Sequence, residues 1–283
     1  MVRKEATNFM DVKIVNAFSI NNKGGNPCAI IDNANNLTAE KMQAKATLLD
    51  LPETIFIIHN KNQYILRFFA TKGELPLCCH GVLGAAFYLF KSNCLQPIYI
   101  QSYHNQNKIN VKYSNNLIAM SIKNNGIILD SNMDFSTIRK LLDIDQVSID
   151  KQLPCAIASI GSPKLLVPII NRNILFDMVP NLDLITHWSK KYSVNGIYAY
   201  SKDTENTNSS YVGRSFNPLF SHQEDIATGA AAAALCHLIS KDKVKLEANY
   251  IIEQGSNLQK PSKIYIAITG KNIEIKGEAY FSN

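Results

Sequence analysis

The sequence RFFATKGELPLCCHGVLGAAFYLF, residues 67–90, has a counterpart in RSFNPLFSHQEDIATGAAAAALCHLI, residues 214–239. Each stretch has the pattern of a strand, a loop, a glycine and then a helix rich in small residues. The leading arginines are 147 residues apart (214 minus 67), and Gly81 and Gly229 are 148 apart (229 minus 81). This agreement in order, spacing and helix composition indicates an internal repeat. We therefore expect two related halves that face each other across a pseudo-dyad.

Short strands and few helices account for the rest of the chain. In the first half we expect strands at 11–19, 27–32, 54–59, 63–70, 97–102, 108–113 and 117–122, with helices at 38–49 and from about Gly81. In the second half we expect strands at 154–159, 164–170, 195–201 and 210–217, helices at 181–192 and 229–241, and three final strands.

The connection between the halves is expected in residues 123–152, which are rich in Asn, Asp and Ser around one short helix. This composition favours turns over a core. The predicted division is 1–130 and 131–283, and the last strand can return to the first half.

The composition is that of a folded protein, because 283 residues with 46% hydrophobic and 18% charged residues can bury a sizeable core. The net charge of +6 is spread out, with its densest group at Lys241, Lys243 and Lys245. A basic stripe interleaved with aromatics is missing, so we expect no nucleic-acid partner. Residues 1–10 read as a short leader, and no apolar run approaches the roughly eighteen residues of a membrane span. We expect a cytoplasmic protein with reduced thiols and no membrane partner.

The cysteines give no sign of a metal site. They form no Cys-x-x-Cys pair and no short-range Cys/His cluster of zinc spacing. The six are Cys28, Cys78, Cys79, Cys94, Cys155 and Cys236.

The two glycine-started helices are candidate anion sites. The run Ala230–Ala234 is the strongest helix former in the chain, and its small side chains allow close packing. A helix start offers free backbone N–H groups and the positive end of the helix dipole, so two converging starts would bind a carboxylate. Ordinary packing is the alternative explanation for either helix alone. Two at matching positions favour a small anionic substrate.

Glu53 is the candidate acid and base. It stands in LPETIFII, at the mouth of a strongly apolar strand. Partial desolvation there would raise the pKa of its carboxyl group, so that it can take and return a proton near neutral pH. The alternative is a solvated carboxylate at a strand start.

His80 and Asp225 precede the two glycines and correspond loosely in the repeat. Both can line one cleft with Glu53, or both can simply cap helix starts. Cys78 and Cys79 raise a third possibility, a two-cysteine epimerase, because a thiolate at a helix start is activated. That mechanism needs an opposed thiol. The second half has Ala, Thr, Gly and Ala at 227–230, so this mechanism is disfavoured.

Several motifs together resemble the phenazine-biosynthesis isomerase (PhzF-like) family over nearly the whole chain. They are GNPCAI (25–30), LPETIF (51–56), ELPLCCHG (74–81), RSFNP (214–218) and EDIATGAAAAAL (224–235), with GSPKLLVPI from Gly161 and Lys-Pro-Ser at 260–262 as further positions. Any one motif alone is weak, whereas the ordered set is specific.

The resemblance implies an α/β (α+β) protein with the diaminopimelate-epimerase-like fold, in which each half is a curved, mostly antiparallel sheet around a central helix. It implies cofactor-free isomerisation in which the glutamate matching Glu53 shifts a proton, as on trans-2,3-dihydro-3-hydroxyanthranilate, with His80 and Asp225 lining the site. The substrate carboxylate would lie at the two helix starts, at Cys79, Gly81, Gly229 and Ala230. A homodimer is plausible by the same resemblance.

The chain departs from the family pattern near the site. Cys79 stands where the family usually has Gly, Gly81 where it has Ala, Ala230 where it has Ser, and Lys260 where it has Arg. The missing hydroxyl at 230 removes one hydrogen bond to an anion, on the order of 1 kcal/mol. These departures keep open a second hypothesis, a non-catalytic homologue that binds small carboxylates.

Overall fold

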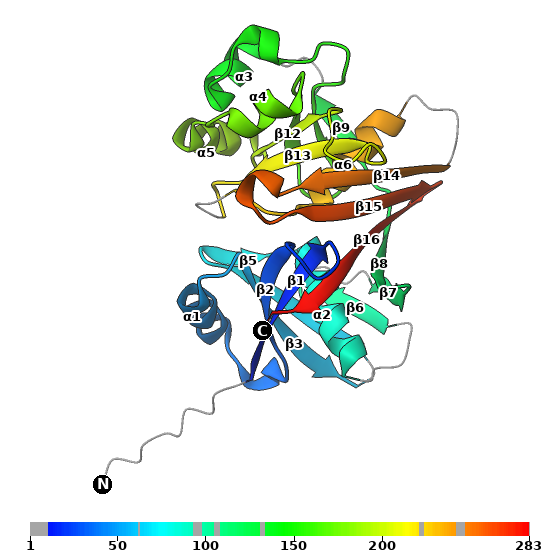
Figure 1. The fold of residues 1–283 in the computed structure, drawn as a ribbon. Coiled ribbons are helices and arrows are strands. Elements are labelled where there is room, and N and C mark those ends of the chain that lie inside the picture. The colour runs from blue at the N-terminus through cyan, green and yellow to red at the C-terminus, as the bar shows by residue number, and fades with distance from the viewer. Residues whose placement is uncertain are drawn as a thin grey trace.

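The computed structural model describes residues 11–61, 63–92, 98–104, 108–130, 134–220, 224–241 and 247–282. In this part the chain forms two similar halves, one above the other in Figure 1. Each is a curved, mostly antiparallel sheet around one central helix, which confirms the expected fold class. The predicted leader 1–10, Cys94, Lys243 and Lys245 lie outside the described residues.

The first half is a closed barrel. Its elements are β1 Val12–Ser19, β2 Asn26–Ile31, α1 Ala39–Leu49, β3 Glu53–Asn60, β4 Gln63–Ala70, β5 Gly73–Leu75, α2 Cys79–Lys91, β6 Ile98–Ser102, β7 Lys108–Ser114 and β8 Leu117–Lys123, with a 3-10 turn at Ala34–Asn36. The strands β1, β2, β3, β4, β6, β7 and β8 follow one another in the sheet, and the last strand of the chain, β16 Asn272–Phe281, pairs with both β8 and β1.

The second half follows the same plan around α6. Its elements are β9 Ile127–Asp130, α3 Phe135–Leu142, β10 Ala156–Ser159, β11 Lys164–Pro168, α4 Arg172–Asp177, α5 Leu182–Tyr192, β12 Ile197–Ser201, β13 Tyr211–Phe216, α6 Gly229–Ser240, β14 Glu247–Gln254 and β15 Ser262–Thr269, with 3-10 turns at Gln146–Ser148 and Ser256–Leu258. The sheet order from β16 is β15, β14, β13, β12, β11, β10 and β9.

Helices α2 and α6 are central because they are apolar on all sides. In α2, 11 of 13 residues are buried, and in α6, 8 of 12 are buried. A helix that is hydrophobic all round needs a partner surface all round, and the encircling strands provide it. Gly84 lets the sheet come close to α2, since a Cβ at this position would collide with Cys28 Sγ of β2.

The internal repeat predicted from the sequence extends to a matching ion pair in each half. Arg67 donates from Nε and Nη2 to the two carboxylate oxygens of Glu74, at 2.7 and 2.6 Å. Arg214 donates in the same way to Glu224, at 3.0 and 2.7 Å. Such two-point arginine–carboxylate pairs fix geometry as well as charge. Each pair fixes the segment that lies between the arginine strand and the central helix of its half.

Most predicted elements are present with small shifts at their ends, and Thr38 is the N-cap of α1. The sequence patterns missed β5, β9 and α4, which are short. Strand β9 lies within the predicted connection and pairs with β10. The division at residue 130 stays a prediction. No helix in the described part of the chain is both long and apolar enough to cross a membrane.

Candidate active site

Glu53 is the first residue of β3 and is buried in the first half, with 8% of its surface exposed. Its neighbours along the strand are the buried Thr54, Ile55 and Phe56. Desolvation by these surroundings raises the pKa of its carboxyl group, and the nearby His80 opposes the rise. The expectation of a desolvated carboxyl group at this position is therefore confirmed.

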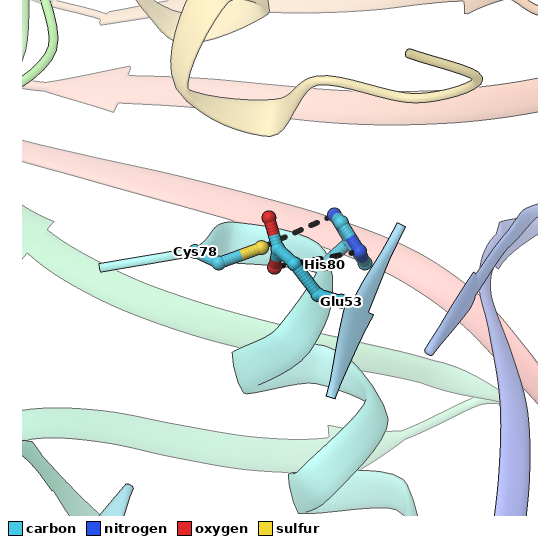
Figure 2. Close-up of side chains that lie close together, drawn as sticks. All are labelled: Glu53, Cys78 and His80. Carbon is cyan, nitrogen blue, oxygen red and sulfur yellow. Dashed lines mark hydrogen bonds and ion pairs between the residues drawn. The ribbon is translucent and has the colours of Figure 1, made fainter. Parts of the chain in front are cut away.

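His80 lies in the first turn of α2 and points its ring at Glu53 (Figure 2). Its Nε2 lies 3.6 Å from Oε2 of Glu53. Its Nδ1 lies 3.1 Å from Cys78 Sγ and 3.3 Å from Nδ2 of Asn26. The amide nitrogen of Asn26 can only donate, so its contact favours Nδ1 as the acceptor and the tautomer that carries the ring proton on Nε2. His80 thus directs an N–H toward Glu53.

Cys78 is the N-cap of α2, and its Sγ accepts a hydrogen bond from the backbone N–H of Gly81 at 3.3 Å. Burial and the charge of Glu53 raise the pKa of the Cys78 thiol well above its ordinary value of 9.0. The same two causes raise the pKa of Cys79 to about 12. Both sulfurs are therefore thiols at neutral pH, which is the reverse of the activated thiolate that a cysteine-based epimerase requires.

Asn26 connects the two halves at the site, and the sequence patterns did not single it out. Its Nδ2 lies 2.6 Å from Oδ1 of Asp225, 3.1 Å from the carbonyl oxygen of Ala227 and 3.3 Å from His80. The residue belongs to the Gly-Asn-Pro motif, which was the available signal. One amide group thereby links the imidazole of the first half to the carboxylate of the second.

Asp225 lies in the loop before α6 and is held on several sides. Its Oδ2 accepts a short hydrogen bond of 2.5 Å from Thr228 Oγ1. Gln254 of β14 donates from Nε2 to the carbonyl oxygen of Asp225 at 2.6 Å, and accepts at Oε1 from the backbone N–H of Thr228 at 3.1 Å. Gln254, which the sequence analysis did not name, therefore fixes the start of α6.

The starts of α2 and α6 meet at Cys79 and Gly229. A Cβ on Gly229 would lie 2.9 Å from Cβ of Cys79 and 3.0 Å from the ring of Phe18. Gly81 faces away from this contact, and a Cβ there would press on Ile55 and Phe68. Ala230 is half-buried at the first turn of α6. The sequence-predicted helix starts thus lie side by side.

A cavity of about 680 Å³ lies between the two halves beside these residues. Glu53 and Pro52 line it from the first half, and Asp225, Phe220 and Lys260 from the second. Of the seven residues predicted for the site, Glu53 and Asp225 line this cavity, while the other five lie in the first turns of α2 and α6.

Glu53, Cys78 and His80 are also the group of described residues whose donor atoms could surround a metal ion, since one donor from each lies within 4.8 Å of the others. Their contacts suit a hydrogen-bonded group better. His80 presents a different nitrogen to each partner, and the Cys78 thiol holds its proton, whereas a metal needs a thiolate.

A family model described as phenazine biosynthesis-like protein (PhzC-PhzF) matches residues 15–282 of the chain. An uncharacterized isomerase of Clostridium acetobutylicum is 27% identical over 249 residues, which are 84% of this chain and 82% of the relative. The trans-2,3-dihydro-3-hydroxyanthranilate isomerase of Pseudomonas chlororaphis is 23% identical over 281 residues, covering 93% and 94%.

Solved structures show the same fold. The PhzF-family phenazine biosynthesis protein of Bacillus anthracis superimposes with a TM-score of 0.86 at 24% identity, over 96% of each chain. A hydroxyproline epimerase of Agrobacterium vitis reaches a TM-score of 0.61 at 8% identity, over 96% of this chain and 89% of its own. The expected diaminopimelate-epimerase-like fold is thereby confirmed.

Proposed function

The chain belongs to the phenazine biosynthesis-like protein family and is an isomerase, and we propose that Glu53 is the general acid and base of its reaction. The observation that carries this proposal is the buried Glu53 carboxyl group, which has a raised pKa, lines the cavity and faces Nε2 of His80. A carboxyl group of this kind can both take and return a proton near neutral pH.

The proposed reaction moves one proton between two carbons of a small, unsaturated carboxylate. Ionised Glu53 takes the proton from the first carbon, and the electron pair of that C–H bond shifts along the conjugated system. Protonated Glu53 then returns the proton to the second carbon, so that no atom or electron is gained or lost. His80 orients the carboxyl group through its Nε2–H, and Asp225 holds the opposite wall of the cavity.

The substrate is proposed to bind by its carboxylate near the starts of α2 and α6. Cys79, Gly81, Gly229 and Ala230 form these two helix starts. The dipoles of both helices favour a negative charge there. Cys79 takes up room that a glycine would leave free.

The Pseudomonas chlororaphis relative is named for trans-2,3-dihydro-3-hydroxyanthranilate, which makes that compound the first substrate to test. A cytoplasmic location, a homodimer and independence from cofactors and metals stay predictions of the sequence.

The test compares turnover of this compound, and of a panel of small cyclic carboxylates, by the wild type and by Glu53→Gln, with product formation followed by proton NMR in water. Glu40→Gln is the matched control, because Glu40 is an exposed glutamate on α1. We expect the Glu53 variant to be slower by at least about 100-fold and the control to be unchanged. Equal turnover by Glu53→Gln would end the proposal. Binding of these carboxylates without turnover by the wild type would favour the non-catalytic homologue.

A further inference from the structure

The two halves differ at the position of Glu53. The two arginines of the repeat occupy matching positions in the sheet: Arg67 is paired with Phe56 of β3, and Arg214 is paired with Ala199 of β12. Three residues earlier lie Glu53 in the first half (56 minus 53) and Gly196 in the second (199 minus 196). Gly196 has a φ of +84°, and a Cβ there would collide with the carbonyl oxygen of Phe216. The second half therefore has no room for a side chain where the first half carries its carboxylate.

A lysine stands beside this glycine. In the first half Glu53 is in register with Cys28 of β2. In the second half the parallel pair of β11 and β12 places Lys164 opposite Gly196, one residue before the pair Leu165 and Ile197. The repeat therefore matches Lys164 with Cys28. The second half carries an amine next to the position that holds a carboxylate in the first.

The Lys164 side chain lies on the face of the sheet that α6 covers. Side chains alternate along a strand, so Lys164 shares a face with Leu166, which belongs to the core around α6, and not with Leu165, which belongs to the core under α3 and α5. Ser215 of β13 is on the same face, since it is paired with Tyr198, another member of the core around α6.

The ammonium group of Lys164 has no partner in the described part of the chain. Lys164 is 3% exposed, and its Nζ makes no hydrogen bond to any described residue. Asp225 acts on it electrostatically, but Oδ1 and Oδ2 of Asp225 already accept hydrogen bonds from Asn26 and Thr228. The Ser215 hydroxyl is buried too, and it makes no hydrogen bond to the residues that the structure describes.

Buried polar groups without hydrogen-bond partners destabilise a fold unless a ligand supplies those partners. Burial lowers the pKa of Lys164 to about 8, and the charge of Asp225 opposes this change only in part. The positive charge of Lys164 is therefore not fully compensated by its surroundings. Asp225, whose charge acts on Lys164, lines the cavity between the two halves.

We propose that Lys164 is the anion-binding residue of the second half, where its ammonium group, with Ser215 and the start of α6, binds the carboxylate of the substrate. This deepens the proposed function and rests on it. The base then comes from the first half, and the second half adds a cation to the anion site at the two helix starts. The ligand class is a small monocarboxylate whose reacting carbons lie toward Glu53, and the corresponding neutral amide is rejected as a substrate.

The test measures binding by calorimetry, so that it does not depend on turnover. The probes are 2-aminobenzoate and benzoate, with 2-aminobenzamide as the neutral analogue. The variants are Lys164→Met, Lys164→Gln in case the first does not fold, and Lys190→Met, which removes an exposed lysine of α5 as a control for net charge. We expect Lys164→Met to bind the carboxylates at least 10-fold more weakly, Lys190→Met to bind them as the wild type does, and the amide to bind equally to all.

Thermal melting separates this role from a structural one. If Lys164 serves to bind a ligand, its unpaired buried charge destabilises the ligand-free protein. Lys164→Met should therefore melt at a higher temperature than the wild type. A lysine that only balances Asp225 would give a lower melting temperature and would weaken acid and amide alike, which would overturn the proposal. Wild-type protein that binds neither carboxylate, or Lys164→Met that binds them as tightly, would overturn it too. Glu53→Gln should still bind the carboxylates. The binding assay therefore tests the Lys164 anion site even if Glu53 proves not to be the general acid and base.

Discussion

His80 Nε2 lies 3.6 Å from Glu53 Oε2, across the start of the helix at the centre of the first half. Both side chains are buried, and Nδ1 of His80 is occupied by Cys78 and Asn26. The histidine can therefore turn only Nε2 toward the carboxyl group. Glu53 is held in an apolar setting beside His80 and the Cys78 thiol, which hydrogen-bonds to it, and this arrangement suits a single group that has to take a proton and give it back.

Glu53 makes both activity and stability depend on pH. Its folded-state pKa is raised above the ordinary value of 4.5, so the folded protein binds this proton more tightly than the unfolded chain. Its contribution to stability is fully present below pH 4.5 and is lost as the pH rises through the folded-state pKa. The acid limb of kcat/KM should lie above the pH of an ordinary glutamate. Urea unfolding of the wild type and of Glu53→Gln across this range measures the first effect, and a difference that does not change with pH would contradict it.

Asn26→Ala should reduce kcat more than it changes KM. The substitution removes the donor to Asp225, Ala227 and His80 while leaving the cavity lining intact. Loss of this buried donor should destabilise the fold by about 1–3 kcal/mol. The 15N chemical shifts of the His80 ring report which nitrogen carries the proton, and we expect the Nε2–H form to lose its dominance in the variant. An unchanged tautomer with unchanged kcat would show that Asn26 has no positioning role.

Cys78→Ala should keep activity within about one order of magnitude, because the buried thiol holds its proton and is a helix cap rather than a base. Loss of the cap should cost about 1 kcal/mol of unfolding free energy, measured by urea titration. Cys78→Ser restores an acceptor for the N–H of Gly81 and serves as the control. Abolished turnover in both variants, with the fold intact, would instead favour a cysteine-based mechanism.

Gly229→Ala should destabilise the protein by about 1–3 kcal/mol, because the new Cβ would lie 2.9 Å from Cys79 Cβ and 3.0 Å from the Phe18 ring. The double variant with Cys79→Gly should recover part of this loss. A double-mutant cycle by thermal unfolding measures the coupling between the two helix starts. Strictly additive effects would mean that the helices do not meet at these residues.

Lys164 should leave a pH signature of opposite sign to Glu53. Its pKa is lowered from 10.5 to about 8, so between these values the unfolded chain binds the proton more tightly and the destabilisation due to this lysine fades as the pH rises. The deficit at pH 7 should be about 3 kcal/mol. We expect the stability gap between Lys164→Met and the wild type to shrink from pH 7.5 to pH 10. A constant gap would mean that Lys164 is not desolvated.

The sequence was sufficient for the parts of the site that depend on local pattern. The apolar strand after Glu53 predicts a desolvated carboxyl group, and the repeated helix starts predict that His80 and Asp225 lie at one site, where both contact Asn26. It was not sufficient for Asn26 or Lys164. The partners of Asn26 lie 54 and 199 residues away, and such contacts depend on how the strands close around the helices.

Short elements were also beyond local pattern. The four residues of β9 are a strand because β10 pairs with them, and without that neighbour their composition resembles a connection. The internal repeat could be identified from the sequence, because both halves have the same spacing of arginine and glycine and a helix rich in small residues. The difference between Glu53 and Gly196 became visible only through strand register.

The most direct measurement is proton NMR of trans-2,3-dihydro-3-hydroxyanthranilate in deuterium oxide, with the wild type beside Glu53→Gln. A Glu53 that exchanges its proton with solvent between the two transfers should bring deuterium into a ring carbon in the wild type and not in the variant. Deuterium entering at the same rate in both samples would contradict the role of Glu53 as the base.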